Sequence, residues 1–451
     1  MKNDLKGNGG KNDPQESLLI YCEKISNRIK YIFGLFFDEL LGIKYRITSD
    51  HEAYLAHSGP SINYAKKPLE KGIFICSDGI LFERGIRNHE LSFINYDGNK
   101  AFFPTFMKQS AFPFDLFAAA FYLVTRYEEY LPYMKDEYGR FSAKESLPYR
   151  EGFLEKPLVN LWADKLKEVL LSGYPEIRFK PRKFRFIPTV DVDAAYAYKQ
   201  KGWFRTLGGY INSLSRFEFP DMAQRTRVLA GMEKDPFDTF EYHLDLQKKY
   251  GLRTIYFILF AEYGLNDKNI SVRNRKFQRL IKMLADYSEI GIHPSFASSK
   301  NSAALKTEVE RLSAVLNREI TKSRQHFLML NLPETYRNLI NLDIREDYSM
   351  GFASMPGFRA GICDPHYFYD LDLDTKTPLR IYPFALMDGT LRDYMDTSND
   401  KAMEHISRLI GEVKKVNGTF ISIWHNESLS DQKRWKGWRT IYEELIKTAL
   451  R

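Results

Sequence analysis

The sequence is poor in cysteine and contains no long apolar run. Its 451 residues include three cysteines, Cys22, Cys76 and Cys363, which are far apart and form no CxxC pair. Neither a disulfide framework nor a cysteine zinc site is therefore expected, and a reducing compartment is the default. The longest apolar run, LFAAAFYLV at residues 116–124, is far too short to span a membrane and predicts a buried helix.

Two further absences exclude classes of function. Residues 1–17 carry no apolar segment, so we expect a flexible tail, no secretory signal and a cytoplasmic protein with no transmembrane segment. No GxGxxG pattern follows the first predicted strand of the second half, and no Walker phosphate loop occurs. The formal net charge is +8, but Lys and Arg are interleaved with Asp and Glu, so nucleic acid is not an expected partner.

The length of the chain favours two domains. Apolar residues make up 44% of the sequence, which is enough for packed cores. Residues 18–180 mix helical and strand patterns and predict a smaller α+β domain of unknown role. Residues 172–183 carry two prolines and several basic residues, and they are the expected linker to a second domain at residues 184–451.

From residue 184 onward, short strand patterns alternate with helical ones. The predicted strands are RFIPTVDVD, RTIYFILF, EIGIHPSF, SRQHFLML, REDYSMGFA, LRIYPFALMD and TFISIWHN. Helical periods lie between them, for example Leu305, Val309, Leu312 and Leu316, with Asn301 as the predicted cap. This alternation predicts a parallel sheet covered by helices, and both an open doubly wound sheet and a closed barrel fit it.

Polar side chains gather at the ends of these predicted strands. Asp191 and Asp193 end the first strand, and strand alternation sends both side chains to the same face. Further acids and histidines lie within or directly after later strands: His293, His326, Asp388 and His425. One carboxylate with neutral imidazoles suits a divalent ion such as Zn²⁺, and a second carboxylate can accept a proton from water that the ion acidifies. A further histidine can protonate a leaving group.

Five segments, taken in order, resemble a known family. TVDVD, GIHPSF, SRQHF, DYSMGF and ISIWHN look like the motifs of the polysaccharide deacetylase family, also called the NodB-homology domain or carbohydrate esterase family 4. The resemblance covers residues 184–451, and residues 18–180 are similar to the N-terminal extension of a divergent bacterial subgroup. It implies a distorted (β/α)7 barrel, a bound divalent metal, usually zinc, and hydrolysis of N- or O-acetyl groups on sugars.

The resemblance also implies catalytic roles. Asp191 resembles the catalytic base, Arg324 the arginine that orients this base, and His425 the histidine that acts as general acid. The family usually has two adjacent acids in the first motif, whereas Val192 separates them here.

The implied metal ligands depart from the family at one position. Asp193 resembles the metal-binding aspartate, and His293 resembles the first metal-binding histidine. The second metal-binding histidine of the family falls on Ala297 in this chain. We infer that His326, where the family motif has a proline, replaces it as the third ligand of a divalent ion, expected to be zinc.

Three residues are expected to contact the substrate: Asp388, Trp424 and Arg359. Trp424 precedes His425 and offers an aromatic face on which a sugar ring can stack. Asp388 and Arg359 also fit purely structural roles. Asp388 precedes Gly389 in a plain DG turn, and Arg359 can pair with any carboxylate.

The leading hypothesis is a metal-dependent hydrolase that removes acetyl groups from an N-acetylated sugar or glycan precursor inside the cell. Two alternatives stay open. One is a metal-free hydrolase of the same fold that acts on another C–N bond, and the other is a catalytically inactive member that binds glycans or serves as a scaffold. The absent histidine at Ala297 favours the alternatives, whereas a compact cluster of the aspartates and histidines favours the hypothesis.

Overall fold

The computed structural model describes residues 17–451, so the tail expected at residues 1–17 lies almost entirely outside the described residues. The chain divides into two compact units. One comprises Met1–Val124, Leu158–Arg182 and Asp372–Lys376, and the other comprises Thr125–Pro157, Lys183–Leu371 and Thr377–Arg451. The second unit thus takes in residues 125–157, which fall within the predicted N-terminal domain.

The first unit contains a parallel four-stranded sheet in the order β2-β1-β3-β4. Its elements are β1 (Leu18–Cys22), α1 (Asn27–Phe33), the π-helix η2 (Gly34–Leu40), β2 (Tyr45–Thr48), α2 (His51–Ala56), β3 (Ser61–Ala65), β4 (Ile73–Cys76), the hairpin strands β5 (Phe93–Tyr96) and β6 (Asn99–Phe102), α3 (Leu116–Val124) and α5 (Leu158–Gly173). Residues 80–82, after β4, form a turn.

Helix α3 is the apolar run of the sequence, and all nine of its side chains are buried, as predicted. The helix begins after Asp115, whose carboxylate accepts hydrogen bonds from the amides of Phe117 and Ala118, each at 3.0 Å. This is the usual way in which an aspartate satisfies the free amides at a helix start. The same carboxylate accepts a hydrogen bond from the hydroxyl of Tyr64 at 2.6 Å, which ties the helix to the sheet.

The second unit contains a nine-stranded sheet in the order β12-β13-β11-β10-β9-β8-β7-β15-β14. Its strands are β7 (Arg185–Val192), β8 (Ile255–Ile258), β9 (Glu289–Ile292), β10 (Lys322–Ser323), β11 (Glu346–Asp347), β12 (His366–Asp370), β13 (Thr375–Ile381), β14 (Leu386–Met387) and β15 (Thr419–His425). Every pairing from β13 through β14 is parallel, which confirms the predicted mixed α/β class. The order has two ends, so the hydrogen bonding does not show the closed barrel that the family resemblance implied.

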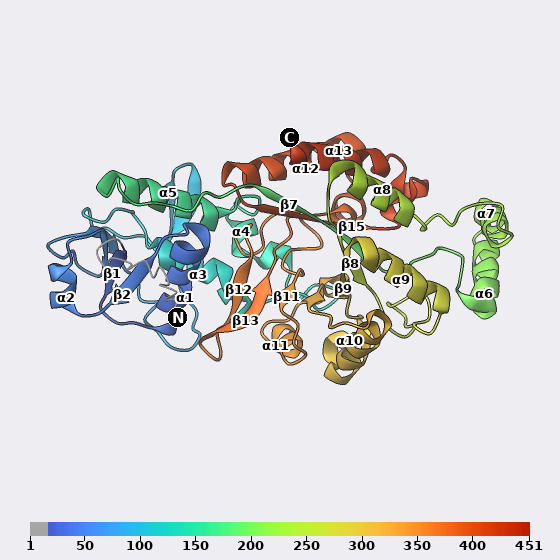
Figure 1. Cartoon of the computed structure of the whole chain (residues 1–451), viewed down its shortest axis with the longest axis horizontal. Helices are drawn as coiled ribbons and strands as arrows, with labels where there is room; N and C mark the ends of the chain where they lie inside the picture. Colours follow the sequence, from blue (N-terminus) through green and yellow to red (C-terminus); the bar gives the residue numbers. More distant parts are fainter. Residues whose placement is uncertain (1–16) are drawn as a thin grey trace, which may run out of the picture. The chain divides into compact units, whose positions relative to one another are not determined.

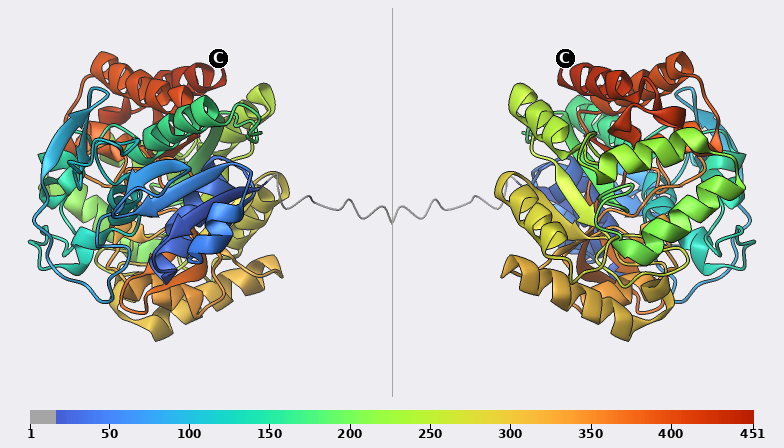
Figure 2. Two further views of the ribbon diagram at one scale, coloured as in Figure 1. Left: turned by 90° about the vertical axis from the view of Figure 1, so that its left-hand side faces the viewer. Right: turned by 90° about the vertical axis from the view of Figure 1, so that its right-hand side faces the viewer.

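Helices cover the strands of this sheet, apart from α6 and α7, which stand away from it (Figure 1). The longer ones are α6 (Gly202–Ser215), α7 (Phe219–Leu229), α8 (Phe240–Tyr250), α9 (Arg275–Tyr287), α10 (Ser302–Leu316), α11 (Glu334–Ile340), α12 (Asn399–Lys415) and α13 (Trp438–Leu450), and the short turns are η3 (Tyr127–Tyr130), η4 (Ala143–Glu145), α4 (Leu147–Arg150), η5 (Ala297–Lys300), η6 (His326–Leu328), η7 (Thr390–Tyr394), η8 (Ser428–Ser430) and η9 (Lys433–Trp435). Figure 2 shows α12 and α13 side by side, packed over the strands.

The sequence sets the ends of several of these helices. The side chain of Asn301 accepts a hydrogen bond from the amide of Ala304 and caps α10, as predicted, and the helix ends at Asn317 with φ 51°. Helix α8 ends at Gly251 with φ 63°, a left-handed conformation that glycine adopts without a steric penalty.

One predicted strand is mostly absent. The pattern SRQHFLML predicts a strand at residues 323–330, but β10 ends at Ser323 and is followed by the 3₁₀ turn η6. The amide of His326 donates to the carbonyl of Pro294 at 3.1 Å, and Phe327 has φ 56°, so the backbone leaves the sheet here. His326 therefore lies on a turn beyond the strand end.

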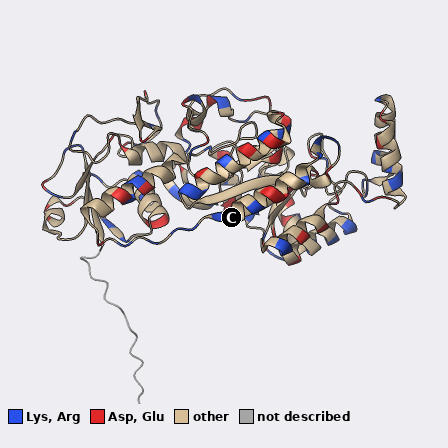
Figure 3. Cartoon of the chain, turned by 90° about the horizontal axis from the view of Figure 1, so that it is seen from above, with Lys and Arg blue, Asp and Glu red and all other residues tan. Residues whose placement is uncertain are grey.

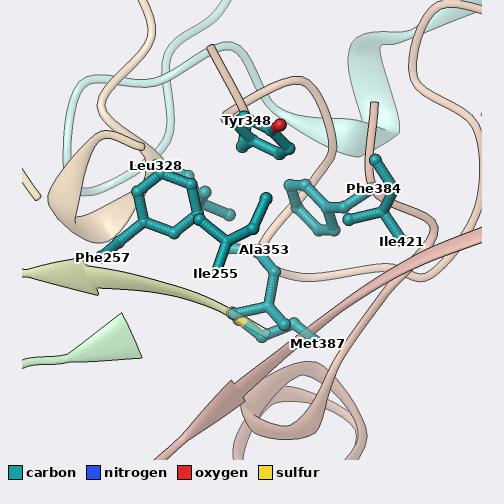
Figure 4. Packing of buried hydrophobic residues seen from close by; sticks show 9 residues of the cluster. Ile255, Phe257, Leu328, Tyr348, Ala353, Phe384, Met387 and Ile421 are labelled. Carbon is teal, nitrogen blue, oxygen red and sulfur yellow. The ribbon is translucent and has the colours of Figure 1, made fainter. Parts of the chain in front are cut away.

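A buried apolar cluster fills the space beside the strands of the second unit (Figure 4). Its members come from strands and connecting segments that are distant in sequence: Ile255, Phe257, Leu328, Tyr348, Ala353, Phe384, Met387, Ile421 and Ile423. The ring of Phe257 lies 4.4 Å from the guanidinium carbon of Arg324. The apolar cluster is therefore in direct contact with a charged residue at the strand ends.

Along most helices, the ribbon carries positions of Lys or Arg as well as positions of Asp or Glu (Figure 3). Within residues 17–451, no helix is both long enough and apolar enough to cross a lipid bilayer.

A buried histidine on α8 makes the stability of the second unit sensitive to acid. His243 is 1% exposed, and both of its ring nitrogens are without a hydrogen-bond partner among the described residues. The rings of Tyr256 and Tyr442 lie 6.0 and 5.7 Å away, centroid to centroid. Burial, together with the positive charge of Arg439, lowers the pKa of His243 to about 3. The imidazole is therefore neutral in the folded protein at neutral pH.

We expect the stability of the second unit to fall as the pH drops below about 6.5, the pKa of an unperturbed histidine. The unfolded chain takes up a proton in this range and the folded chain does not until about pH 3, so unfolding is favoured by acid. The substitution His243→Phe removes this difference in proton uptake. The free energy of unfolding of the variant, relative to that of wild type, should therefore be about 2 kcal/mol higher at pH 5 than at pH 8. Urea unfolding at both pH values measures it, with His405→Gln as the surface control; equal pH dependence of wild type and His243→Phe would contradict the expectation.

Candidate active site

Parallel pairing brings several polar residues to one edge of the nine-stranded sheet. Strands β7 and β15 pair over seven residues, and the register places Asp191 opposite His425. His293 follows the last residue of β9, and Arg324 follows the last residue of β10. Because the carboxyl ends of parallel strands meet at the same edge, these side chains converge.

Asp191 and Arg324 form a buried ion pair. Nη1 of Arg324 donates to Oδ1 of Asp191 at 2.8 Å, and the two side chains are 0% and 4% exposed. Nη1 also donates to the hydroxyl of Thr189 at 2.7 Å, and Nε donates to the carbonyl of Tyr348 at 3.0 Å. A guanidinium fixed at this many points holds its carboxylate partner in one orientation.

The hydrogen bonding of His293 fixes its tautomer. Its Nδ1 contacts the carbonyl oxygen of Arg324. A carbonyl only accepts hydrogen bonds, so Nδ1 carries the proton and the lone pair of a neutral ring lies on Nε2. Nε2 is 3.2 Å from Oδ1 of Asp193 and 3.8 Å from Oδ2 of Asp191. His293 thus presents a metal-ligating nitrogen to the two aspartates.

His326 is oriented in the same way by a carboxylate. Its Nδ1 lies 2.9 Å from Oδ1 of Asp267, so a proton on Nδ1 leaves Nε2 facing Oδ2 of Asp193 at 3.6 Å. Asp267 also accepts the amides of Phe296 at 2.8 Å and Ala297 at 3.2 Å. Burial lowers the pKa of His326, but Asp193 and Asp267 outweigh burial and raise the pKa to about 9.

Asp193, His293 and His326 form a set of three ligand atoms that all lie within 4.8 Å of one another. Oδ1 of Asp193 is buried and makes no hydrogen bond with the described residues, although Nε2 of His293 is close to it. Burial raises the pKa of Asp193, but the charge of His326 and the proximity of His293 outweigh it, and the pKa lies well below its usual range. One carboxylate and two imidazole nitrogens are a ligand set that fits a Zn²⁺ ion, and Oδ1 of Asp193 has no other hydrogen-bond partner among the described residues.

His425 and Asp388 form a second oriented pair. Nδ1 of His425 lies 2.7 Å from Oδ1 of Asp388, and the backbone amide of His425 donates to Oδ2 at 2.8 Å. Nε2 of His425 therefore faces inward, 3.7 Å from Oδ2 of Asp193. Burial lowers the pKa of His425, but the charge of Asp388 outweighs it and raises the pKa well above its usual range.

A cavity of about 330 Å³ in the second unit is lined by Asp191, Asp193, His293, His326 and His425. Its wall also includes Arg140, Phe327, Tyr394, Glu427, Arg434 and Trp435. Arg140 comes from the segment 125–157 and donates to the carbonyl of Phe327 at 2.6 Å and to Asp136 at 2.7 Å. The cavity therefore combines acids and bases at the strand ends with aromatic and cationic groups at its rim.

Two residues expected to bind substrate do not fit that role where the structure places them. Trp424 is 0% exposed and packs on Trp438 and Tyr442, because it points to the opposite face of β15 from His425. Arg359 is buried, and its Nε donates to Glu129 at 2.8 Å while Nη1 donates to the carbonyl of Gly351 at 3.1 Å. Both side chains are part of the packed interior.

Asp388, the third residue expected to contact substrate, has no exposed surface either. Its carboxylate is occupied by His425 and by the amide of Gly389 at 2.6 Å. The DG turn and the contact with His425 explain the buried position of Asp388. In this position its carboxylate is not available to contact substrate directly.

Sequence reasoning missed two residues of this site. Asp267 lies in the long segment after β8, and an acid in a segment that follows a strand of a parallel sheet is the kind of signal that could have found it. Arg140 belongs to the predicted N-terminal domain, so no pattern connected it with the strand ends.

A family model matches the first part of the chain. Residues 18–175 match a family of unknown function, DUF7033. No curated protein matches the chain.

Several solved structures are similar to part of the chain. A "putative polysaccharide deacetylase" from Mycobacterium smegmatis is 15% identical, with a TM-score of 0.40 over 59% of this chain and 84% of that one. A carbohydrate esterase family 4 pseudoenzyme from Bacillus anthracis is 12% identical, with a TM-score of 0.30 over 59% and 62%. An allantoinase is 10% identical, with a TM-score of 0.38 over 60% and 85%. These likenesses are too distant to assign an activity.

If His326 is a zinc ligand held by Asp267, both residues control zinc affinity. We expect Asp267→Asn to weaken zinc binding by about 10- to 100-fold, as is usual when the partner of a metal-bound histidine is changed, and His326→Ala to weaken it further. Competition with a chromogenic chelator measures the affinities, and His57→Ala in the first unit is the control. Wild-type zinc affinity in His326→Ala would show that His326 is not a ligand.

Proposed function

We propose that the chain is a metal-dependent hydrolase that removes an acetyl group from an N-acetylated sugar or glycan precursor. The observation that carries the proposal is the convergence of Asp191, Asp193, His293, His326 and His425 on one cavity, where an oriented carboxylate and an oriented imidazole accompany a three-ligand set. Residues scattered over the surface would have supported an inactive scaffold instead.

Asp193, His293 and His326 are the residues that would hold the ion. A bound Zn²⁺ would supply Lewis acidity, which polarises the acetyl carbonyl and makes a water molecule easier to deprotonate. The remaining chemistry belongs to the chain. Asp191 accepts the proton of the attacking water with its Oδ2, because Oδ1 is held by Arg324.

His425 delivers a proton to the departing nitrogen. Its Nδ1 is fixed on Asp388, so Nε2 is the atom that faces the cavity. Asp388 touches neither substrate nor water in this scheme and acts as a positioning residue. An amine is a poor leaving group unless it is protonated, which is why an oriented acid is needed beside the scissile bond.

The rim of the cavity suits a sugar. Trp435 and Tyr394 line it, and Nε1 of Trp435 donates to Glu427 at 3.0 Å, which fixes the indole ring. Aromatic faces pack against the C–H faces of a sugar ring, while Arg140 and Arg434 can donate hydrogen bonds to its hydroxyls or to an anionic group.

Removing the proposed base should abolish deacetylation without removing the metal. We expect Asp191→Asn to lower the rate of acetate release from N-acetylglucosamine oligosaccharides by at least about 100-fold, since the amide cannot accept the proton of water. The exposed Asp396→Asn is the matched control. Wild-type rates in Asp191→Asn, or no acetate release by zinc-loaded wild type on any acetylated amino sugar, would contradict the proposal, and full activity without metal would favour the metal-free alternative.

Asp388→Asn should act through His425 alone. We expect kcat to fall by about 100-fold with KM and zinc content unchanged, because the ring of His425 loses its anchor while the substrate wall is intact. Steady-state kinetics and metal analysis of the same preparation separate the effects. A change confined to KM would mean that Asp388 contacts the substrate after all.

A further inference from the structure

Two helices of the second unit form a hairpin set apart from the helices that cover the sheet. Figure 1 shows α6 and α7 at one end of the drawing, joined to the rest of the unit by two connecting segments, and Figure 2 shows the same hairpin from its outer side. Hydrogen bonds anchor it, with Asp221 on Lys433 at 2.7 Å and Gln224 on Gln432 at 2.8 Å.

The outer face of α6 is apolar and exposed. Trp203 is 66% exposed, Phe204 72%, Leu207 50%, Ile211 60% and Leu214 52%. Their spacing places all five on one side of a helix. A helix of a water-soluble protein normally turns such a face toward the core.

The inner face of the hairpin is polar instead. Ser213 is the one residue of α6 that is buried, and its hydroxyl donates to Asp221 of α7 at 2.9 Å. The hydroxyls of Tyr210 and Thr226 lie 2.8 Å apart, and the guanidinium of Arg225 stands over the ring of Tyr210 at 5.4 Å. The hairpin therefore holds its polar groups together inside and directs its large apolar groups outward.

The apolar surface continues beyond α6 and is accompanied by positive charge. Phe217 and Phe219 at the turn of the hairpin are 77% and 58% exposed, and Met232 after α7 is 80% exposed. Residues 199–234 contain seven Lys or Arg and three Asp or Glu, and α6 itself carries Arg205 and no acid. Aromatic and aliphatic residues on one face with arginine nearby are typical of helices that lie in the interface of an anionic membrane.

We propose that the α6–α7 hairpin docks the protein on the surface of an anionic lipid bilayer, with the outer face of α6 at the boundary of headgroups and acyl chains. Charge favours this occupant over a second copy of the chain, because a copy would bring the same positive excess to the contact, whereas anionic lipid attracts it. The mode is peripheral binding of a 14-residue helix that lies along the surface.

Docking would bring the cavity of the second unit close to the lipid. The hairpin is anchored at Gln432 and Lys433, and the next two residues, Arg434 and Trp435, line the wall of the cavity. Attachment through the hairpin does not depend on the chemistry proposed for the cavity, so each can fail without the other.

Vesicle binding of the full chain tests the attachment. We expect it to cosediment with vesicles of phosphatidylglycerol and phosphatidylcholine and to bind pure phosphatidylcholine at least about tenfold more weakly. The double variant Leu207→Ser, Ile211→Ser should bind the anionic vesicles at least about tenfold more weakly than wild type with an unchanged unfolding curve. The control Phe106→Ser removes a side chain that is 95% exposed in the first unit, and it should bind as wild type. Asp191→Asn should also bind as wild type, which separates docking from catalysis.

Tryptophan fluorescence gives a second readout, since Trp203 is 66% exposed and the other four tryptophans are at most 4% exposed. Anionic vesicles should shift the emission to shorter wavelength and protect it from acrylamide, and Trp203→Phe should abolish both effects. The proposal is overturned if the chain ignores anionic vesicles or if the Leu207 and Ile211 substitutions leave binding unchanged. A dimer in light scattering that these substitutions dissociate, without vesicle binding, would assign the face to a second copy.

Discussion

The pairing of β7 with β15 is the constraint on which the site depends. Seven consecutive residue pairs fix the register, and this register alone places Asp191 beside His425. A slip of one residue would turn every side chain of one strand to the other face, so it would turn Asp191 away from the cavity and Val190 or Val192 toward it. The β8 register then sets Phe257 opposite Asp191, and the guanidinium of Arg324 rests on that ring. The charged pair is thus held over an apolar floor that keeps both partners in one arrangement.

A second constraint holds the segment 125–157 in the same unit as the cavity. Nε of Arg126 donates to Glu129 at 2.7 Å, and Glu129 pairs with Arg359 in turn, so three buried charges form one network. Removing Glu129 would leave the buried guanidinium of Arg359 without a carboxylate partner among the described residues, which is costly. The network fixes the segment beside the cavity, where Arg140 forms part of the wall. The segment lies within residues 18–175, the part of the chain that matches DUF7033.

Much of the second unit could be predicted because local patterns and tertiary structure agree there. The period of α10, its Asn301 cap and the strand carrying Asp191 follow directly from the sequence. The turn at His326 could not be predicted, because apolar residues in FLML fit a strand equally well and a contact with Pro294 decides against it. Asp267 and Arg140 reach the site from segments without periodicity. Trp424 was misplaced for a simpler reason: its neighbour His425 faces the cavity, and adjacent strand residues face opposite ways.

Helices α6 and α7 escaped prediction because their pattern is inverted. Recognition of a helix relies on an apolar face that packs inward, and here the inward residues are Ser213, Tyr210 and Gly209.

Asp267 ties two segments of the second unit together. Its carboxylate contacts Nδ1 of His326 and accepts the amides of Phe296 and Ala297, so the segment after β9 and the turn after β10 share one anchor. Loss of this carboxylate would release both segments at once, so the orientation of the His326 ring and the path of the backbone at residues 296–297 are mechanically coupled.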